Sequence, residues 1–166
     1  NREAVCQTTQ DFVDFLDLMQ SAQEKFPVRV LAYSLMPNHC HFVLWPMEAD
    51  NMSRGMHWLL STHSHRYREK YESVGHVWQG RYKSLLVKDD AQMFTLMRYV
   101  EANPVRAGLC KSCDDWRWSS AHERKLPSPA WSILSQPPIE LPLDWINYVN
   151  ASVQEDEKKP VTGTGK

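Results

Sequence analysis

The chain has 166 residues, 42% of them hydrophobic, which suffices for one domain with a hydrophobic core and is too short for two. Nineteen Lys and Arg against 20 Asp and Glu give a net charge of −1, which argues against a protein that coats nucleic acid non-specifically. No stretch approaches the ~20 apolar residues of a membrane-spanning helix, so we expect a soluble cytoplasmic protein without a membrane partner.

The first part of the chain predicts a helix followed by two antiparallel strands. Thr8 or Thr9 can cap a helix whose apolar residues recur at helical spacing as far as Phe26, and Pro27 marks its end. The segments VRVLAYSLMP and NHCHFVLW are rich in β-branched and aromatic residues. They meet at a Pro-Asn turn signal, which indicates an antiparallel pair.

The middle of the chain predicts helix, strand and helix in turn. Apolar residues follow helical spacing over 51–71, and the alternation in HVWQGRYKSLLV, residues 76–87, favours a third strand. Asp89 or Asp90 can cap the next helix, which should stop near Asn103 because Pro104 disfavours helical geometry in the residue before it. We therefore expect an α+β fold of the ferredoxin-like βαββαβ type, an antiparallel sheet with helices on one face, whose first strand is missing or truncated.

The last third of the chain shows weaker patterns. Residues 111–153 are aromatic and proline-rich, so we expect an extended arm that packs on residues 1–110 through its tryptophans. Residues 154–166 are charged and then rich in Gly and Thr, which is typical of a disordered tail.

Two histidines and a tyrosine carry the chemistry that the sequence suggests. On a strand, His39 and His41 point to one face while Cys40 points to the other. Tyr99 and Asn103 lie one helical turn apart on the predicted helix that begins after Asp89 or Asp90. Two imidazoles and an amide oxygen could hold a metal ion beside a phenol that attacks phosphorus. Taken alone, however, an HxH pair is more often structural than metal-binding.

A basic segment follows the histidines. From Arg54 to Lys88 there are seven Lys and Arg against two Glu, interleaved with aromatic residues, which is compatible with binding a nucleic-acid strand. The candidate DNA contacts are Arg66, Arg68, Trp78, Arg81 and Lys83. A solvated helix face followed by an ordinary strand would give the same pattern. The single CxxC, formed by Cys110 and Cys113, is a weak zinc signal and favours free thiols.

Four motifs, MPNHCHFVLWP, GHVWQGRYKSLLV, YVEANPVRAGL and DWRWSS, occur in this order within residues 1–120. In them the chain resembles the single-tyrosine HUH transposases, and specifically the REP-associated tyrosine transposases of bacteria. The resemblance implies that residues 1–110 are a catalytic domain, that His39, His41 and Asn103 hold Mg²⁺ or Mn²⁺, and that Tyr99 is the nucleophile. Cys40 departs from the bulky aliphatic residue usual between the two histidines.

The resemblance also implies a reaction and a partner. Single-stranded DNA at a hairpin of the REP type would be cut and rejoined through a 5′-phosphotyrosine intermediate, by a protein that is monomeric rather than dimeric. A domesticated protein that binds the hairpin without cutting it would keep the same motifs. A metal-dependent hydrolase or oxygenase would need a carboxylate at the site, and Glu101 lies off the Tyr99 face of the helix.

Overall fold

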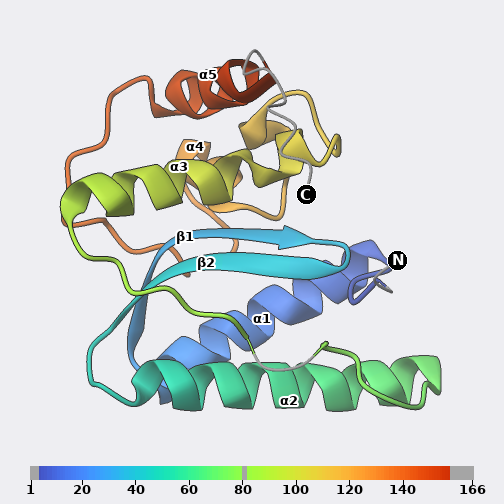
Figure 1. Cartoon of the computed structure of the whole chain (residues 1–166). Coiled ribbons are helices and arrows are strands. Elements are labelled where there is room, and N and C mark those ends of the chain that lie inside the picture. The colour runs from blue at the N-terminus through green and yellow to red at the C-terminus, as the bar shows by residue number, and fades with distance from the viewer. Residues whose placement is uncertain (1–3, 80–81, 158–166) are drawn as a thin grey trace, which may run out of the picture.

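The computed structural model describes residues 4–79 and 82–157. The elements, in chain order, are α1 (Thr9–Lys25), β1 (Val28–Met36), β2 (His39–Pro46), α2 (Asn51–Tyr71), α3 (Asp90–Arg106), the 3-10 turn η1 (Cys113–Asp115), α4 (Ser120–Lys125) and α5 (Trp145–Glu157). The hairpin of β1 and β2 lies between two groups of helices, with α1 and α2 on one side and α3, α4 and α5 on the other (Figure 1). No helix within the described ranges is long and apolar enough to cross a lipid bilayer.

The predicted strand pair is confirmed, and its register follows from the turn. Met36 lies opposite His39, so only Pro37 and Asn38 connect the two strands. An irregularity between Val30 and Ala32 shifts the pairing near the start of β1. The segment around Trp118 covers part of the outer edge of β1, since Leu35 donates its N–H to the Trp118 carbonyl at 2.9 Å.

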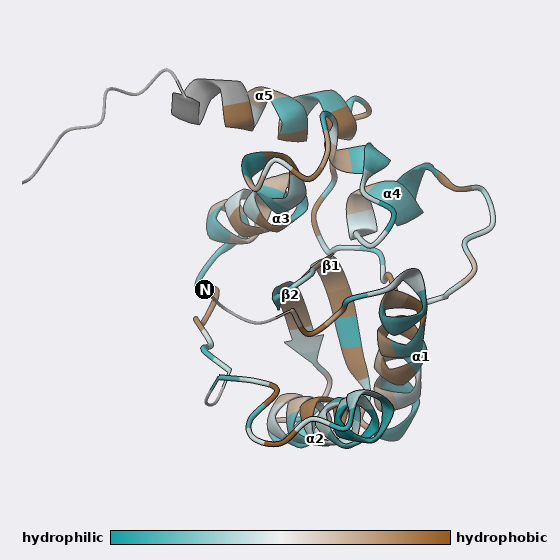
Figure 2. Ribbon diagram, turned by 90° about the vertical axis from the view of Figure 1, so that its right-hand side faces the viewer, coloured by the Kyte–Doolittle hydropathy of each residue, from teal (hydrophilic) through white to brown (hydrophobic). Residues whose placement is uncertain are grey.

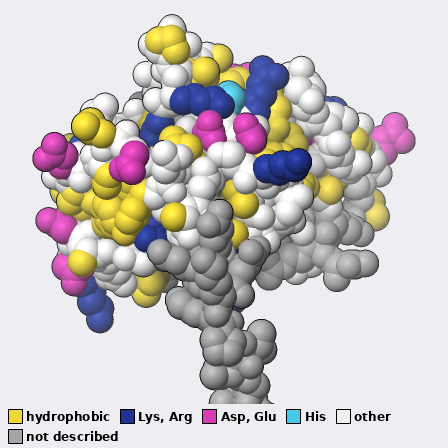
Figure 3. Space-filling view, turned by 90° about the horizontal axis from the view of Figure 1, so that it is seen from above, with side chains coloured by type: hydrophobic (Ala, Val, Ile, Leu, Met, Phe, Trp, Pro, Cys, Tyr) yellow, Lys and Arg dark blue, Asp and Glu magenta, His cyan; other side chains and the backbone are white. Residues whose placement is uncertain are grey.

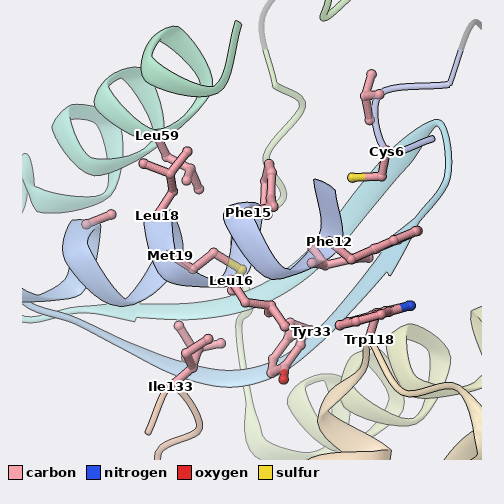
Figure 4. Packing of buried hydrophobic residues seen from close by; sticks show 14 residues of the cluster. Cys6, Phe12, Phe15, Leu16, Leu18, Met19, Tyr33, Leu59, Trp118 and Ile133 are labelled. Atoms are coloured by element: carbon pink, nitrogen blue, oxygen red, sulfur yellow. The ribbon is translucent and has the colours of Figure 1, made fainter. Parts of the chain in front are cut away.

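Each face of the hairpin packs against its own hydrophobic core. Phe42 and Leu44 of β2 pack on a cluster built mainly from α1, whereas Val43 joins a second cluster that includes Met97 of α3. The first cluster also holds Trp118 from the later chain, which stacks on Phe12 with ring centroids 4.9 Å apart (Figure 4). Figure 2 shows the strands between the two groups of helices. The period-two alternation of β2 therefore decides which side chains face α3.

Side-chain caps fix where α1 and α3 begin. Thr8 and Asp11 form a capping box at the start of α1, and Asp89 accepts from the Gln92 N–H at the start of α3. Asp11 also accepts from Lys70 and Tyr71 at the end of α2, at 2.6 Å each. Burial would raise the pKa of Asp11, but these hydrogen bonds outweigh it and hold that pKa well below its ordinary value.

The βαββαβ prediction is only partly right. The α+β class and the antiparallel hairpin are present, but residues 76–79 and 82–88 form no strand, and the helices cover both faces instead of one. Residues 4–7 form no strand either. The described part of the chain contains a sheet of two strands, and residues 76–79 and 82–88 form a largely exposed connection before α3.

Two further boundaries differ from the predictions. Helix α3 continues through Pro104 to Arg106. The segment after residue 110 is less extended than expected, because it contains η1, α4 and α5, and residues 154–157 belong to α5 rather than to a disordered tail. Two of its tryptophans bond to earlier parts of the chain: the Trp145 indole N–H donates to Glu101, and the Trp131 indole N–H donates to Asp17. The remainder of the predicted tail, 158–166, lies outside the described residues.

Candidate active site and nucleic-acid interface

Three aromatic side chains predicted from the sequence meet between β2 and α3. The rings of His39 and His41 are 4.9 Å apart between centroids and nearly perpendicular. The His41 ring is 6.1 Å from the ring of Tyr99, again edge to face. Tyr99 follows His41 by 58 positions in the sequence (99 − 41), so the fold, and not sequence proximity, brings the phenol to the two imidazoles.

The surroundings of the two histidines suit a cation. His39 Nδ1 lies 2.5 Å from Asn38 Oδ1, and because an amide oxygen only accepts, Nδ1 carries a proton and Nε2 is the nitrogen that has the lone pair when the ring is neutral. Burial, and then the neighbouring His39, lowers the pKa of His41 to about 4. His41 is therefore neutral at pH 7, which is the state that a metal ion requires.

Tyr99 is accessible to a substrate. Its side chain is 46% exposed, and the guanidinium of Arg106 lies 5.0 Å from its ring centroid. Arg106 also donates to the Tyr99 carbonyl at 3.3 Å. The sequence interpretation missed Arg106, although it lies two helical turns after Tyr99 on the same face of α3 and could have been found by extending that stripe.

Asn103 lies one turn beyond Tyr99 and is buried. Its amide nitrogen donates to the Tyr99 carbonyl at 3.0 Å, which leaves Oδ1 as the atom that could act as a ligand. Among the described residues, no group of three or more His, Cys, Asp and Glu side chains is arranged to hold a metal. Two imidazoles and an amide oxygen nevertheless suit a divalent ion such as Mn²⁺, whose other ligands would be oxygens.

Two neighbouring residues are excluded from this chemistry by their surroundings. Cys40 packs against the core on the α1 side, and burial raises the pKa of its thiol to about 12. Glu101 is fully buried and accepts hydrogen bonds from Ser120, Arg124 and Trp145. A hydrolase or oxygenase that used Glu101 as a metal ligand is therefore not supported.

The predicted DNA contacts lie on α2 and on the connection that follows it. Arg66 and Arg68 are exposed on α2, and Lys83 is exposed on the connection that leads to α3. Trp78 is half-buried, with its ring centroid 5.9 Å from that of Phe15. Arg81 lies outside the described residues. On the opposite side of the molecule, Lys and Arg are mixed with Asp and Glu, so no field of one sign covers that face (Figure 3).

Comparison with known proteins identifies the family. Residues 1–103 match the family model described as "Transposase IS200 like". A protein of Haemophilus influenzae that carries the provisional name REP-associated tyrosine transposase is 27% identical over 124 residues, which cover 66% of this chain and 70% of the relative.

The fold also has a solved counterpart. A structure of a REP-associated tyrosine transposase bound to a REP hairpin superposes with a TM-score of 0.62 at 19% identity, covering 84% of this chain and 87% of that one. At this identity the likeness concerns the fold. The family match covers well over half of the chain, so the protein belongs to the IS200-like transposase family.

Proposed function

We propose that this protein cuts and rejoins single-stranded DNA by tyrosine transesterification. The observation that carries the proposal is the approach of the Tyr99 ring to the pair formed by His39 and His41. A phenol, two imidazoles and a nearby amide supply a nucleophile and a set of metal ligands. The family assignment makes DNA the substrate class that fits this inventory.

Each residue has a defined part in the reaction. Tyr99 Oη attacks the phosphorus, the bond from phosphorus to the 3′-oxygen breaks, and the 3′-oxygen leaves as a hydroxyl while the 5′-phosphate stays on Tyr99. Attack by a 3′-hydroxyl reverses the step and releases the tyrosine. His39, His41 and Asn103 would hold Mg²⁺ or Mn²⁺, which polarises the phosphate and favours the phenolate. Arg106 keeps a positive charge at the Tyr99 ring.

The proposed substrate is a REP-type hairpin with an unpaired foot. The structural counterpart was solved with such a hairpin, and this chain shares its fold. Arg66, Arg68 and Lys83 are exposed on one stretch of chain and could contact phosphates. Residues 1–110 would form the catalytic domain and 111–153 a segment packed on it. We propose that the protein acts as a monomer, because a single chain contributes the histidines, the asparagine and the tyrosine.

The proposal predicts a covalent product. The protein is mixed with a labelled REP-type hairpin and Mn²⁺, and a denaturing gel is searched for a band that contains both protein and DNA. The wild type should give this band, and Tyr99→Phe should lose it while still binding the hairpin. A matched control, Tyr148→Phe, should keep it. Hairpin binding without any adduct would instead identify a protein that only binds DNA.

A further inference from the structure

We infer that a cavity lined by α2, by residues 75–78 and by Tyr82 binds one unpaired nucleotide of the DNA strand, away from the scissile phosphate. This inference rests on the proposed function, because it assumes a single-stranded DNA substrate. It adds a recognition site on the α2 side of the hairpin, whereas Tyr99 belongs to the α3 side (Figure 1).

The cavity has the size of a small-ligand site. Its volume is about 450 Å³, within the range usual for pockets that hold small molecules. Helix α2 forms one wall and the connection after it forms the other. The residues of α2 that line it are Ser53, His57, Leu60, Ser61, Ser64 and Arg68, and those of the connection are Gly75, His76, Val77, Trp78 and Tyr82.

The α2 wall is a polar stripe along one helix face. His57, Ser61, Ser64 and Arg68 follow each other at intervals of three or four residues, so their side chains line the same groove. Hydroxyl and imidazole groups can donate to or accept from the edge of a base, and a guanidinium fits a phosphate oxygen. Arg66, two residues before Arg68, points to another face and is not part of the lining.

The opposite wall offers aromatic rings for stacking. Trp78 is held in place because its ring lies 5.3 Å from that of His63 and 5.9 Å from that of Phe15. Tyr82, which is 36% exposed, completes this wall. Proteins bind unpaired bases by stacking them on aromatic rings. When the ring is already fixed, binding loses less side-chain conformational entropy. The Trp78 indole nitrogen is also buried without a hydrogen-bond partner. Buried donors normally have an acceptor, so this N–H is a group that a bound ligand could satisfy.

The lining suits an anionic ligand. It includes the guanidinium of Arg68 but no Asp or Glu among the described residues. Lys83 follows Tyr82 directly and is exposed, so a second phosphate could be contacted as the strand leaves the cavity. A free mononucleotide would share the chemistry of the site, but this second contact favours a nucleotide within a strand.

The test combines one blocking variant with DNA that lacks single bases. Ser61→Trp places a bulky side chain in the cavity from an exposed position of α2, and His65→Trp is the matched control on the same helix outside the lining. Hairpins with an abasic site at each unpaired position are titrated against the wild type and both variants. For the wild type and His65→Trp, one abasic position should weaken binding roughly tenfold.

In Ser61→Trp the intact DNA should bind roughly tenfold more weakly, and the same abasic position should cause no further loss. The nucleotide site would be overturned if no abasic position weakened binding to the wild type, or if Ser61→Trp and His65→Trp bound all the hairpins equally well. Either result would leave hairpin binding and cutting intact. Absence of both hairpin binding and adduct in the wild type would overturn the proposed function as well. Deoxynucleoside monophosphates that compete as strongly as the hairpin would show a free-nucleotide site instead.

Discussion

Asn38 holds one ring nitrogen of His39. Its side-chain oxygen accepts from Nδ1, so Nε2 is the nitrogen that carries the lone pair when the ring is neutral. Partners of this kind orient metal-binding histidines and raise their basicity, and their loss weakens metal affinity about 10- to 100-fold. Asn38 should therefore affect the metal requirement of the reaction more than DNA binding.

Asn38→Ala should raise the Mn²⁺ concentration needed for half-maximal adduct formation at least about tenfold. Asn38→Asp retains an acceptor for Nδ1 and suits the turn, so it should remain close to the wild type. The measurement is a titration of adduct yield against Mn²⁺, with hairpin affinity measured separately. Equal metal dependence of the wild type and Asn38→Ala would show that Asn38 does not prepare His39.

At the residue scale, strand alternation predicted that His39 and His41 share a face, and the ring geometry confirms it. Asn38 and Arg106 were not predicted. The contact from Asn38 to His39 joins adjacent residues and depends on rotamers that periodicity does not specify. Arg106 was overlooked because Pro104 suggested an earlier end to the helix.

Helix α3 carries Tyr99 and is anchored by a buried network around Glu101. The Glu101 carboxylate accepts from Arg124 Nε at 2.9 Å and from Trp145 Nε1 at 2.6 Å, and it also accepts from Ser120. Arg124 in turn donates to the Leu31 carbonyl at 2.6 Å. One carboxylate thus ties α3 to α4 and α5, while its Arg124 partner reaches β1.

Replacing Glu101 by Gln should destabilise the protein by about 3 to 5 kcal/mol, because the Arg124 charge would remain buried without its partner. Urea unfolding followed by circular dichroism measures the loss. The double variant with Arg124→Met should recover part of it, and exposed Glu24→Ala should change stability by less than about 0.5 kcal/mol. A Glu101→Gln protein as stable as Glu24→Ala would contradict this role.

Two elements show what periodicity cannot supply. Residues 76–87 alternate as a strand does, yet a strand requires a neighbour for its backbone hydrogen bonds, and the described chain offers none to residues 82–88. Helix α3 passes Pro104, which lacks the N–H that would bond the Val100 carbonyl. The helix nevertheless continues, since the N–H of Ala107 bonds the Asn103 carbonyl at 2.9 Å. In both cases the backbone hydrogen bonds that are formed, and not the periodicity of the sequence, decide the structure.

The whole molecule is a hairpin between two cores, and this arrangement buries imidazoles on both sides. Burial lowers the pKa of His63, in the α1 and α2 layer, to about 4, as it does for His41 on the α3 side. In the unfolded chain both imidazoles regain their ordinary pKa, so the unfolded state binds more protons between roughly pH 6.5 and pH 4. Stability is therefore fully present above that window and falls as the pH drops through it.

For each of these histidines, the ratio of folded to unfolded protein should fall about tenfold for each pH unit lost within the window, because the unfolded chain is protonated there. His63→Gln should flatten the dependence measured by urea unfolding in the presence of a chelator, whereas His65→Gln, at an exposed position of α2, should not. Asp11 acts in a different range: its pKa is lowered by folding, so its contribution is lost only below about pH 4. Identical slopes for the wild type and His63→Gln would refute the assignment.

The central claim is that DNA becomes joined to Tyr99. The most direct measurement is to react the protein with hairpin DNA and Mn²⁺, digest the adduct with nuclease and protease, and locate the attached nucleotide by mass spectrometry. The account predicts a nucleotide linked through its 5′-phosphate to the peptide that contains Tyr99, with a free 3′-hydroxyl on the released DNA. A nucleotide on another residue, or a cut strand with unmodified protein, would contradict it.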